Sequence, residues 1–97
     1  LGLEYTIVEK HPPFMTDKNC FMIKALSDAY SSVTKKDGTP QAMCGSTYAR
    51  VFEQGASFGV GDEVWPGSCH QANEFVDKKH FLESYEIYKQ AIYNLVK

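Results

Sequence analysis

The spacing of apolar residues after Asp77 constrains the fold more than any other feature of this sequence. Apolar side chains recur there at intervals of three or four, at Phe81, Tyr85, Tyr88, Ile92 and Leu95. This spacing marks one face of an α-helix, and Asp77 stands where a helix N-cap is expected. Val76 and Phe81 occupy the positions of a hydrophobic staple. The sequence therefore predicts a final amphipathic helix, whose tyrosines we expect to pack in a core or at its rim.

Strand-like and helix-like segments alternate upstream of this helix. The expected order is a strand over 3–8, a helix from Thr16 or Asp17 to about Val33, a strand over 41–44, a short helix over 48–53, a strand over 56–60, a loop over 59–68 and the final helix. Such alternation predicts an α/β fold, with helices packed on a partial mixed sheet in the order β-α-β-α-β-loop-α.

Two details of the predicted helices can be tested directly. The first helix should face the core with a stripe at helical spacing, formed by Phe21, Ala25, Ala29 and Val33. Gly55 follows the short helix, and we expect it to close that helix in the left-handed conformation.

Length and charge exclude several classes of protein. A chain of 97 residues forms one domain at most. Its 10 basic and 12 acidic residues give a net charge of −2, which argues against binding to nucleic acid or an anionic membrane. Charges interrupt the long apolar stretches, so neither a transmembrane helix nor a signal peptide is expected. Cys20, Cys44 and Cys69 form no disulfide framework by number or spacing, which favours a reducing cytoplasm.

The first residues suggest a piece of a larger protein. The chain begins Leu1-Gly2-Leu3, without methionine, and enters a strand-like pattern at once. We therefore expect these residues to be a segment cut from a longer polypeptide.

A turn of small residues is the first candidate for chemistry. Gly45, Ser46 and Thr47 precede a predicted helix, and N–H groups at a helix start attract anions such as carboxylate or phosphate. The same residues also suit an ordinary helix start, with Ser46 or Thr47 as the cap. The residues alone leave both interpretations open.

His70 is the second candidate. It follows the turn-forming sequence Pro66-Gly67-Ser68-Cys69, and loops beyond strand ends are where α/β proteins place their ligands. A neutral imidazole is the commonest metal ligand in proteins. A loop histidine bonded to backbone fits the sequence as well.

Two cysteine-based sites are weaker alternatives. A zinc site built from Cys44, Cys69 and His70 is disfavoured, because the sequence has no C-x-x-C pair and no identified fourth ligand. A cysteine nucleophile paired with His11 or His80 lacks a recognisable orienting partner.

Taken in order, these motifs resemble the C-terminal end of a family of metallopeptidases. The segments are Gly45-Ser46-Thr47-Tyr48-Ala49-Arg50, Phe58-Gly59, Pro66-Gly67 and His70-Gln71-Ala72-Asn73-Glu74. They are similar to the cocatalytic zinc dipeptidases of the PepV type (Xaa-His dipeptidases), which are relatives of carnosinase, aminoacylase and carboxypeptidase G. The resemblance covers nearly the whole chain, from Pro12-Pro13 to the tyrosine-rich last helix.

The resemblance implies a zinc-dependent dipeptidase that has an α/β catalytic domain, an inserted lid domain and two zinc ions. His70 matches the family's last metal ligand, and Gly45, Ser46 and Thr47 match the loop that lines the substrate pocket. Residues 1–10 would include the strand that returns from the lid domain. Zinc is the expected metal, with cobalt or manganese left open. The implied partners are a dipeptide substrate and the rest of the same catalytic domain, and the isolated segment could self-associate.

The sequence departs from the family in two ways. The family loop reads Gly-Gly-Gly-Thr, whereas here Cys44 and Ser46 replace two glycines, and non-glycine residues resist positive φ. The family's other metal ligands, a His-x-Asp motif, a bridging Asp and a Glu-Glu pair, do not occur in this chain. We therefore expect residues 1–97 to be the C-terminal segment of the catalytic domain, inactive alone. The alternative is a small self-contained module for anion binding or protein interaction.

Overall fold

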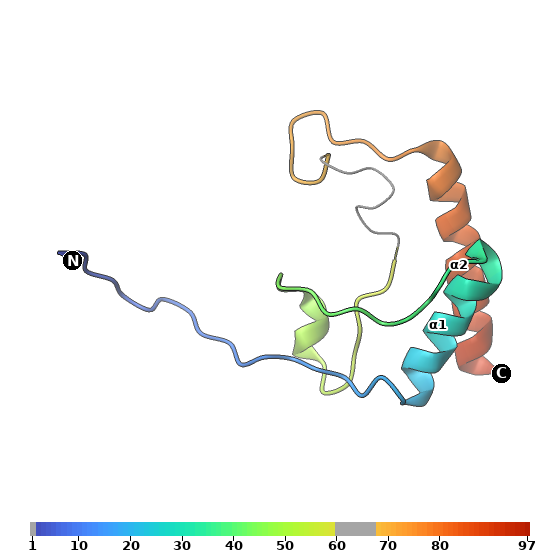
Figure 1. Cartoon of the computed structure of the whole chain (residues 1–97), viewed down its shortest axis with the longest axis horizontal. Coiled ribbons are helices and arrows are strands. Elements are labelled where there is room, and N and C mark those ends of the chain that lie inside the picture. Colours follow the sequence, from blue (N-terminus) through green and yellow to red (C-terminus); the bar gives the residue numbers. More distant parts are fainter. Residues whose placement is uncertain (1, 60–67) are drawn as a thin grey trace.

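The computed structural model describes residues 2–59 and 68–97, and the elements found there are all helical (Figure 1). They are α1 (Phe21–Thr34), the 3-10 helix η1 (Tyr48–Val51) and α2 (Lys78–Val96). These described residues include no strand, so the α/β prediction is wrong.

The three predicted strands fail for a common physical reason. A strand exists only through hydrogen bonds to a neighbouring strand, whereas a helix makes its own. Residues 3–8, 41–44 and 56–59 have no such ladder in the structure, and residue 60 lies outside the described residues. Figure 1 shows the first residues running alone, away from both long helices, before the segment passes η1. The alternating pattern at 3–8 therefore does not become a strand in this chain.

Helix α1 starts later than predicted. Its N-cap is Cys20, not Thr16 or Asp17, and no side chain caps it. Asp17 instead forms a turn ahead of the helix: its carboxylate accepts from the N–H of Asn19 at 2.9 Å, and its carbonyl accepts from the N–H of Cys20 at 3.1 Å. The helix ends at Lys35, which is left-handed with φ of 61° and donates its N–H to the Ser31 carbonyl.

Helix α2 confirms the strongest expectation from the sequence. Asp77 is its N-cap, and the Asp77 carboxylate accepts from the N–H of Lys79 at 2.7 Å. This bond satisfies one of the backbone donors that every helix start leaves without an internal partner. The local sequence therefore fixes where α2 begins.

The two long helices pack together through small side chains. The buried apolar residues of the described chain are Ile23, Ala25, Ala29, Ile87 and Ala91. Alanines let two helix backbones approach closely, and Ile87, only 2% exposed, fills the remaining space.

This packing corrects both predicted apolar stripes. Ala25 and Ala29 are buried as expected, but Phe21 is 64% exposed. In α2 the stripe from Phe81 to Leu95 stays exposed, and a neighbouring face of the helix, which carries Ile87 and Ala91, meets α1. The large aromatic residues do recur at helical spacing, but α1 and α2 contact each other through the helix faces that carry the alanines.

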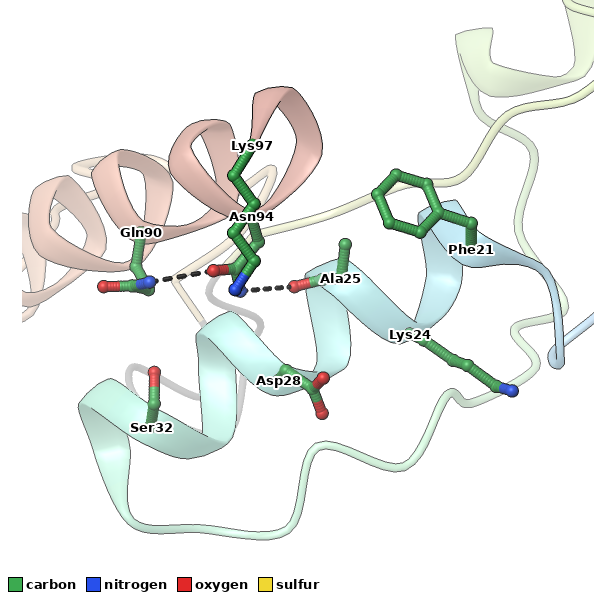
Figure 2. Close-up of a pocket in the computed structure, with 8 residues that line it drawn as sticks. All are labelled: Phe21, Lys24, Ala25, Asp28, Ser32, Gln90, Asn94 and Lys97. Atoms are coloured by element: carbon green, nitrogen blue, oxygen red, sulfur yellow. Dashed lines mark hydrogen bonds between the residues drawn. The ribbon is translucent and has the colours of Figure 1, made fainter.

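A polar contact crosses the same interface. Asn94 of α2 donates from its side-chain amide to the Ala25 carbonyl at 3.1 Å, and Gln90 donates to the Asn94 side-chain oxygen at 2.8 Å (Figure 2). Because the Asn94 amide must lie opposite the Ala25 carbonyl to make this bond, the contact sets how α1 and α2 are aligned along their lengths.

The short helix η1 differs from its prediction in length and in closure. It is a 3-10 helix over Tyr48–Val51, whereas the sequence predicts a helix over 48–53. Gly55 is not in the left-handed conformation. Its lack of a side chain instead lets its backbone lie close to η1, because a Cβ there would be 3.1 Å from the Ala49 carbonyl oxygen. The buried Gly55 accepts from the Thr16 hydroxyl, which ties the N-terminal segment to η1.

The chain as a whole is open. Its radius of gyration is 16.7 Å, whereas a compact chain of this length has about 13 Å. Of the helices in the described residues, none combines the length and the apolar character needed to cross a membrane. Among the described residues, the helical pair is the packed part, and the other described segments extend from it.

Candidate functional site

The turn at Gly45–Thr47 leads directly into η1. Thr47 is the N-cap, and its hydroxyl oxygen accepts from the N–H of Ala49 at 3.2 Å. This confirms the capping role that the sequence allows for Ser46 or Thr47. Gly45 and Ser46 are exposed, so this part of the turn is open to a ligand.

The glycine replacements do not strain the turn. Cys44 and Ser46 both have negative φ, so neither is in the left-handed conformation that resists a side chain. Gly45 also lacks positive φ, and a Cβ there would meet only the end of the Met43 side chain, at 3.2 Å. The turn therefore accommodates the residues that replace the family's glycines.

A second contact fixes the Thr47 hydroxyl. Ser57 donates its hydroxyl proton to the Thr47 oxygen at 2.9 Å. A threonine hydroxyl has two acceptor lone pairs and one donor proton. Since Ser57 and Ala49 both donate to Thr47, its own O–H is the group that remains to bind an acceptor on a ligand.

His70 lies in a loop closed by its own hydrogen bonds. Gln71 donates its N–H to the Ser68 carbonyl at 3.1 Å, and Glu74 donates to the Gln71 carbonyl at 3.2 Å. The buried Ser68 donates its hydroxyl to the Phe75 carbonyl at 3.4 Å. His70 itself is left-handed, with φ of 58°, and exposed. Histidine is among the residues that tolerate this conformation, so the loop presents an imidazole on its surface.

The donor set around His70 is incomplete. Among residues 2–59 and 68–97, no three His, Cys, Asp or Glu side chains lie close enough together to hold a metal ion. Within that part of the chain, this excludes the zinc site of Cys44, Cys69 and His70 weighed above. A metal centre fits His70 only as one ligand among several, because structural and catalytic zinc sites need three or four protein ligands.

The other two histidines contact acidic residues. His11 donates from Nε2 to the Glu9 carboxylate, which also lies 3.6 Å from a guanidinium nitrogen of Arg50. His80 Nδ1 lies 4.0 Å from the Glu83 carboxylate, one turn further along α2. These contacts provide no support for a cysteine–histidine nucleophile.

A shallow cavity of about 310 Å³ between α1 and α2 contains none of the candidate site residues. Figure 2 shows its lining, which is Phe21, Lys24, Ala25, Asp28, Ser32, Gln90, Asn94 and Lys97. The cavity therefore belongs to the packing of the two helices.

Two residues near the turn escaped the sequence analysis. Ser57 contacts Thr47, as described, and Tyr88 of α2 donates its hydroxyl to the Phe58 carbonyl at 3.0 Å. The only sequence signals were the Phe58-Gly59 motif and a tyrosine in an apolar stripe. Neither signal reveals a hydrogen bond between segments that are distant in the sequence.

Comparison with known proteins defines the class of this chain. The pattern of Peptidase family M20/M25/M40 matches residues 2–94. The chain therefore belongs to this peptidase family, in agreement with the metallopeptidase resemblance seen in its motifs.

Individual relatives agree with this assignment. Proteins named "putative dipeptidase" from Staphylococcus aureus strains USA300, NCTC 8325 and COL are each 34% identical to it over 94 residues. The match covers 97% of this chain and 20% of each relative, so the chain spans about a fifth of the length of these proteins. No solved structure matches the chain.

Proposed function

We propose that this chain forms the C-terminal segment of the catalytic domain of a metal-dependent dipeptidase and is inactive alone. The family match over residues 2–94, with relatives named as dipeptidases, is the observation that carries the proposal. The exposed apolar faces of the described residues support it, because large apolar patches usually meet another surface. In this proposal the rest of the same catalytic domain covers them. The small buried core disfavours a self-contained module.

His70 is the proposed metal ligand. Its imidazole is exposed on a loop that three hydrogen bonds close, so the ring can be offered to a metal held mainly by other residues. Zinc, with cobalt or manganese as alternatives, would polarise the peptide carbonyl and activate a water molecule. Two metal ions per intact site are proposed, of which His70 binds one.

Gly45, Ser46 and Thr47 are the proposed substrate-binding residues. The first two are exposed, and the Thr47 hydroxyl retains a donor proton after accepting from Ser57 and Ala49. A dipeptide offers carbonyl and carboxylate oxygens that accept such a proton. The turn would orient the substrate beside the metal ions.

The variant His70→Asn, made in the enzyme that contains this segment, tests the metal role. Asparagine tolerates the left-handed backbone at position 70, so the loop is kept while the imidazole is removed. We expect dipeptide hydrolysis to fall about 100-fold or more, together with metal content, because loss of a direct ligand exceeds the effects of losing outer-shell partners.

The control is His11→Asn, the same substitution at another exposed histidine. Metal analysis and dipeptide turnover should both stay near those of the parent enzyme. Full metal content and normal turnover in His70→Asn would refute the proposed ligand.

A further inference from the structure

Tyr88 attaches a loop segment to helix α2 by two contacts to one residue. Its hydroxyl donates to the Phe58 carbonyl at 3.0 Å. Its ring meets the Phe58 ring edge to face, with centroids 5.7 Å apart and planes at 81°. Edge-to-face packing is a favourable geometry for aromatic pairs, so ring and hydroxyl hold the same point of the segment.

The next residue shows how close this approach is. A Cβ built at Gly59 would lie 2.6 Å from the Tyr88 hydroxyl oxygen, which is nearer than side-chain carbons come to such atoms. Gly59, with φ of 156°, leaves the space in which the Tyr88 hydroxyl lies, and a side chain at this position would displace that hydroxyl. The Phe58-Gly59 pair is thus shaped to receive Tyr88.

The preceding residue links the same segment to the turn. Ser57 donates its hydroxyl to the Thr47 oxygen at 2.9 Å, and Thr47 in turn caps η1 through the Ala49 N–H. Residues 57–59 are therefore held at both ends, by Tyr88 on one side and by Thr47 on the other. The connection runs from α2 to the turn through two side-chain hydroxyls and one short piece of backbone.

We propose that Tyr88 is a positioning residue for the turn at Gly45–Thr47. By fixing residues 57–59, it places the Ser57 hydroxyl against Thr47 and so aims the Thr47 O–H toward a dipeptide acceptor. The inference rests on the substrate role proposed above for this turn, and it adds a specific residue of α2 to that role. Tyr88 itself makes no contact with the substrate in this scheme.

Hydrogen exchange in the metal-free enzyme that contains this segment tests the link without metal or substrate. Tyr88→Phe keeps the ring and removes only the hydroxyl. We expect the exchange rate of the Ala49 amide to rise about fivefold, as for the loss of one neutral hydrogen bond. The matched control is Tyr93→Phe on the same helix, where the tyrosine is exposed and its ring lies near Lys97. An unchanged Ala49 rate, or an equal rise in both variants, would overturn the proposal.

Ser57→Ala breaks the same link without altering a helix. It should also raise the Ala49 exchange rate, while the amides within α1 and α2 exchange as in the parent protein. A normal Ala49 rate in this variant would likewise overturn the proposal, even if Tyr88→Phe had disturbed the packing of α2.

The consequence for the substrate is measured in the enzyme that contains this segment. Tyr88→Phe should raise the dipeptide KM about fivefold and leave kcat within about twofold, because an orienting contact is weakened while the metal ligands stay in place. Altered Ala49 exchange with an unchanged KM would contradict the substrate role of the turn. Unaltered exchange contradicts the Tyr88 link itself, so the two failures are distinguished.

Discussion

The helical pair and residues 3–8 both carry a regular apolar pattern but reach different states. Helices α1 and α2 satisfy their backbone internally and bury alanines against each other. In residues 3–8, apolar and polar side chains alternate as they do in a strand. These residues nevertheless stay exposed and form no hydrogen bonds to a neighbouring strand. The difference shows that a helical pattern, whose hydrogen bonds join nearby residues, produces a helix in this chain. A strand pattern, which needs a second strand as partner, does not produce a strand here.

The largest effect should come from removing the main contact of the helical pair. Ile87 is 2% exposed between α1 and α2, and Ile87→Ala leaves a cavity there. We expect a loss of about 2–5 kcal/mol in the free energy of unfolding, the usual range for a buried isoleucine. Thermal unfolding followed by the helical circular dichroism signal measures it.

Ile92→Ala is the matched control on the same helix. Ile92 is 62% exposed, and truncation of such a residue changes stability by about 0.5 kcal/mol or less. Equal destabilisation by the two variants would show that the helices pair through the outward face, contrary to the structure.

A smaller effect should follow from a change where an extended segment crosses α1. A Cβ at Gly38 would lie 2.5 Å from the Ser27 carbonyl oxygen and 2.6 Å from the Ser31 hydroxyl oxygen. Gly38→Ala should therefore push the segment off the helix at a cost of about 1–3 kcal/mol, as overpacking does. Chemical denaturation measures this loss of stability. The control is Gly45→Ala, where the new Cβ would meet only the flexible Met43 side chain, and it should reduce stability clearly less. Matching losses for both alanines would mean that Gly38 is not in close contact with α1.

The smallest effect concerns a turn that stabilises itself. The Thr39 hydroxyl donates to the Asp37 carboxylate at 2.7 Å, and the Thr39 N–H donates to it at 3.0 Å. Both bonds lower the pKa of Asp37, with the hydroxyl as the larger cause. Thr39→Val should raise this pKa toward its ordinary value, as read from an NMR titration of the Asp37 side chain.

The direction of the pH effect follows from that lowered pKa. A carboxylate whose pKa is lower in the folded chain stabilises the fold above its unfolded pKa and loses this effect as pH falls through the folded pKa. Because Asp37 is fully exposed, the effect should appear in the titration and not in the unfolding midpoint. A titration curve identical in parent and variant would show that the Thr39 hydroxyl makes no bond to the ionised carboxylate.

The sequence predicted those parts of the fold that depend on neighbouring residues. Asp77 caps α2 as expected, and Thr47 caps η1, because an N-cap bond joins residues two positions apart. The face of each helix that packs was harder to predict. Phe21 and Ile92 lie on apolar stripes, yet the helices meet through alanines, and this choice depends on the partner surface.

The candidate site likewise has one part that could be predicted from neighbouring residues and one part that could not. The motifs at Gly45–Thr47 and His70 could be recognised from residue types, and the family match agrees with the class they indicate. The Ser57 and Tyr88 contacts could not, since they join segments that only the folded chain brings together. Among the described residues no three His, Cys, Asp or Glu side chains lie together, so the metal site proposed above would need ligands from outside them.

The alanine interface has a consequence for how this sequence can vary. Ala29 is wholly buried, so an added carbon there must strain the packing or push α1 and α2 apart. The outward aromatic positions can change singly and leave the helix spacing untouched. If every position of α1 and α2 were substituted and helicity measured, the harmful substitutions should fall in a narrow stripe along each helix. Substitutions at the exposed aromatic residues beside that stripe should be tolerated.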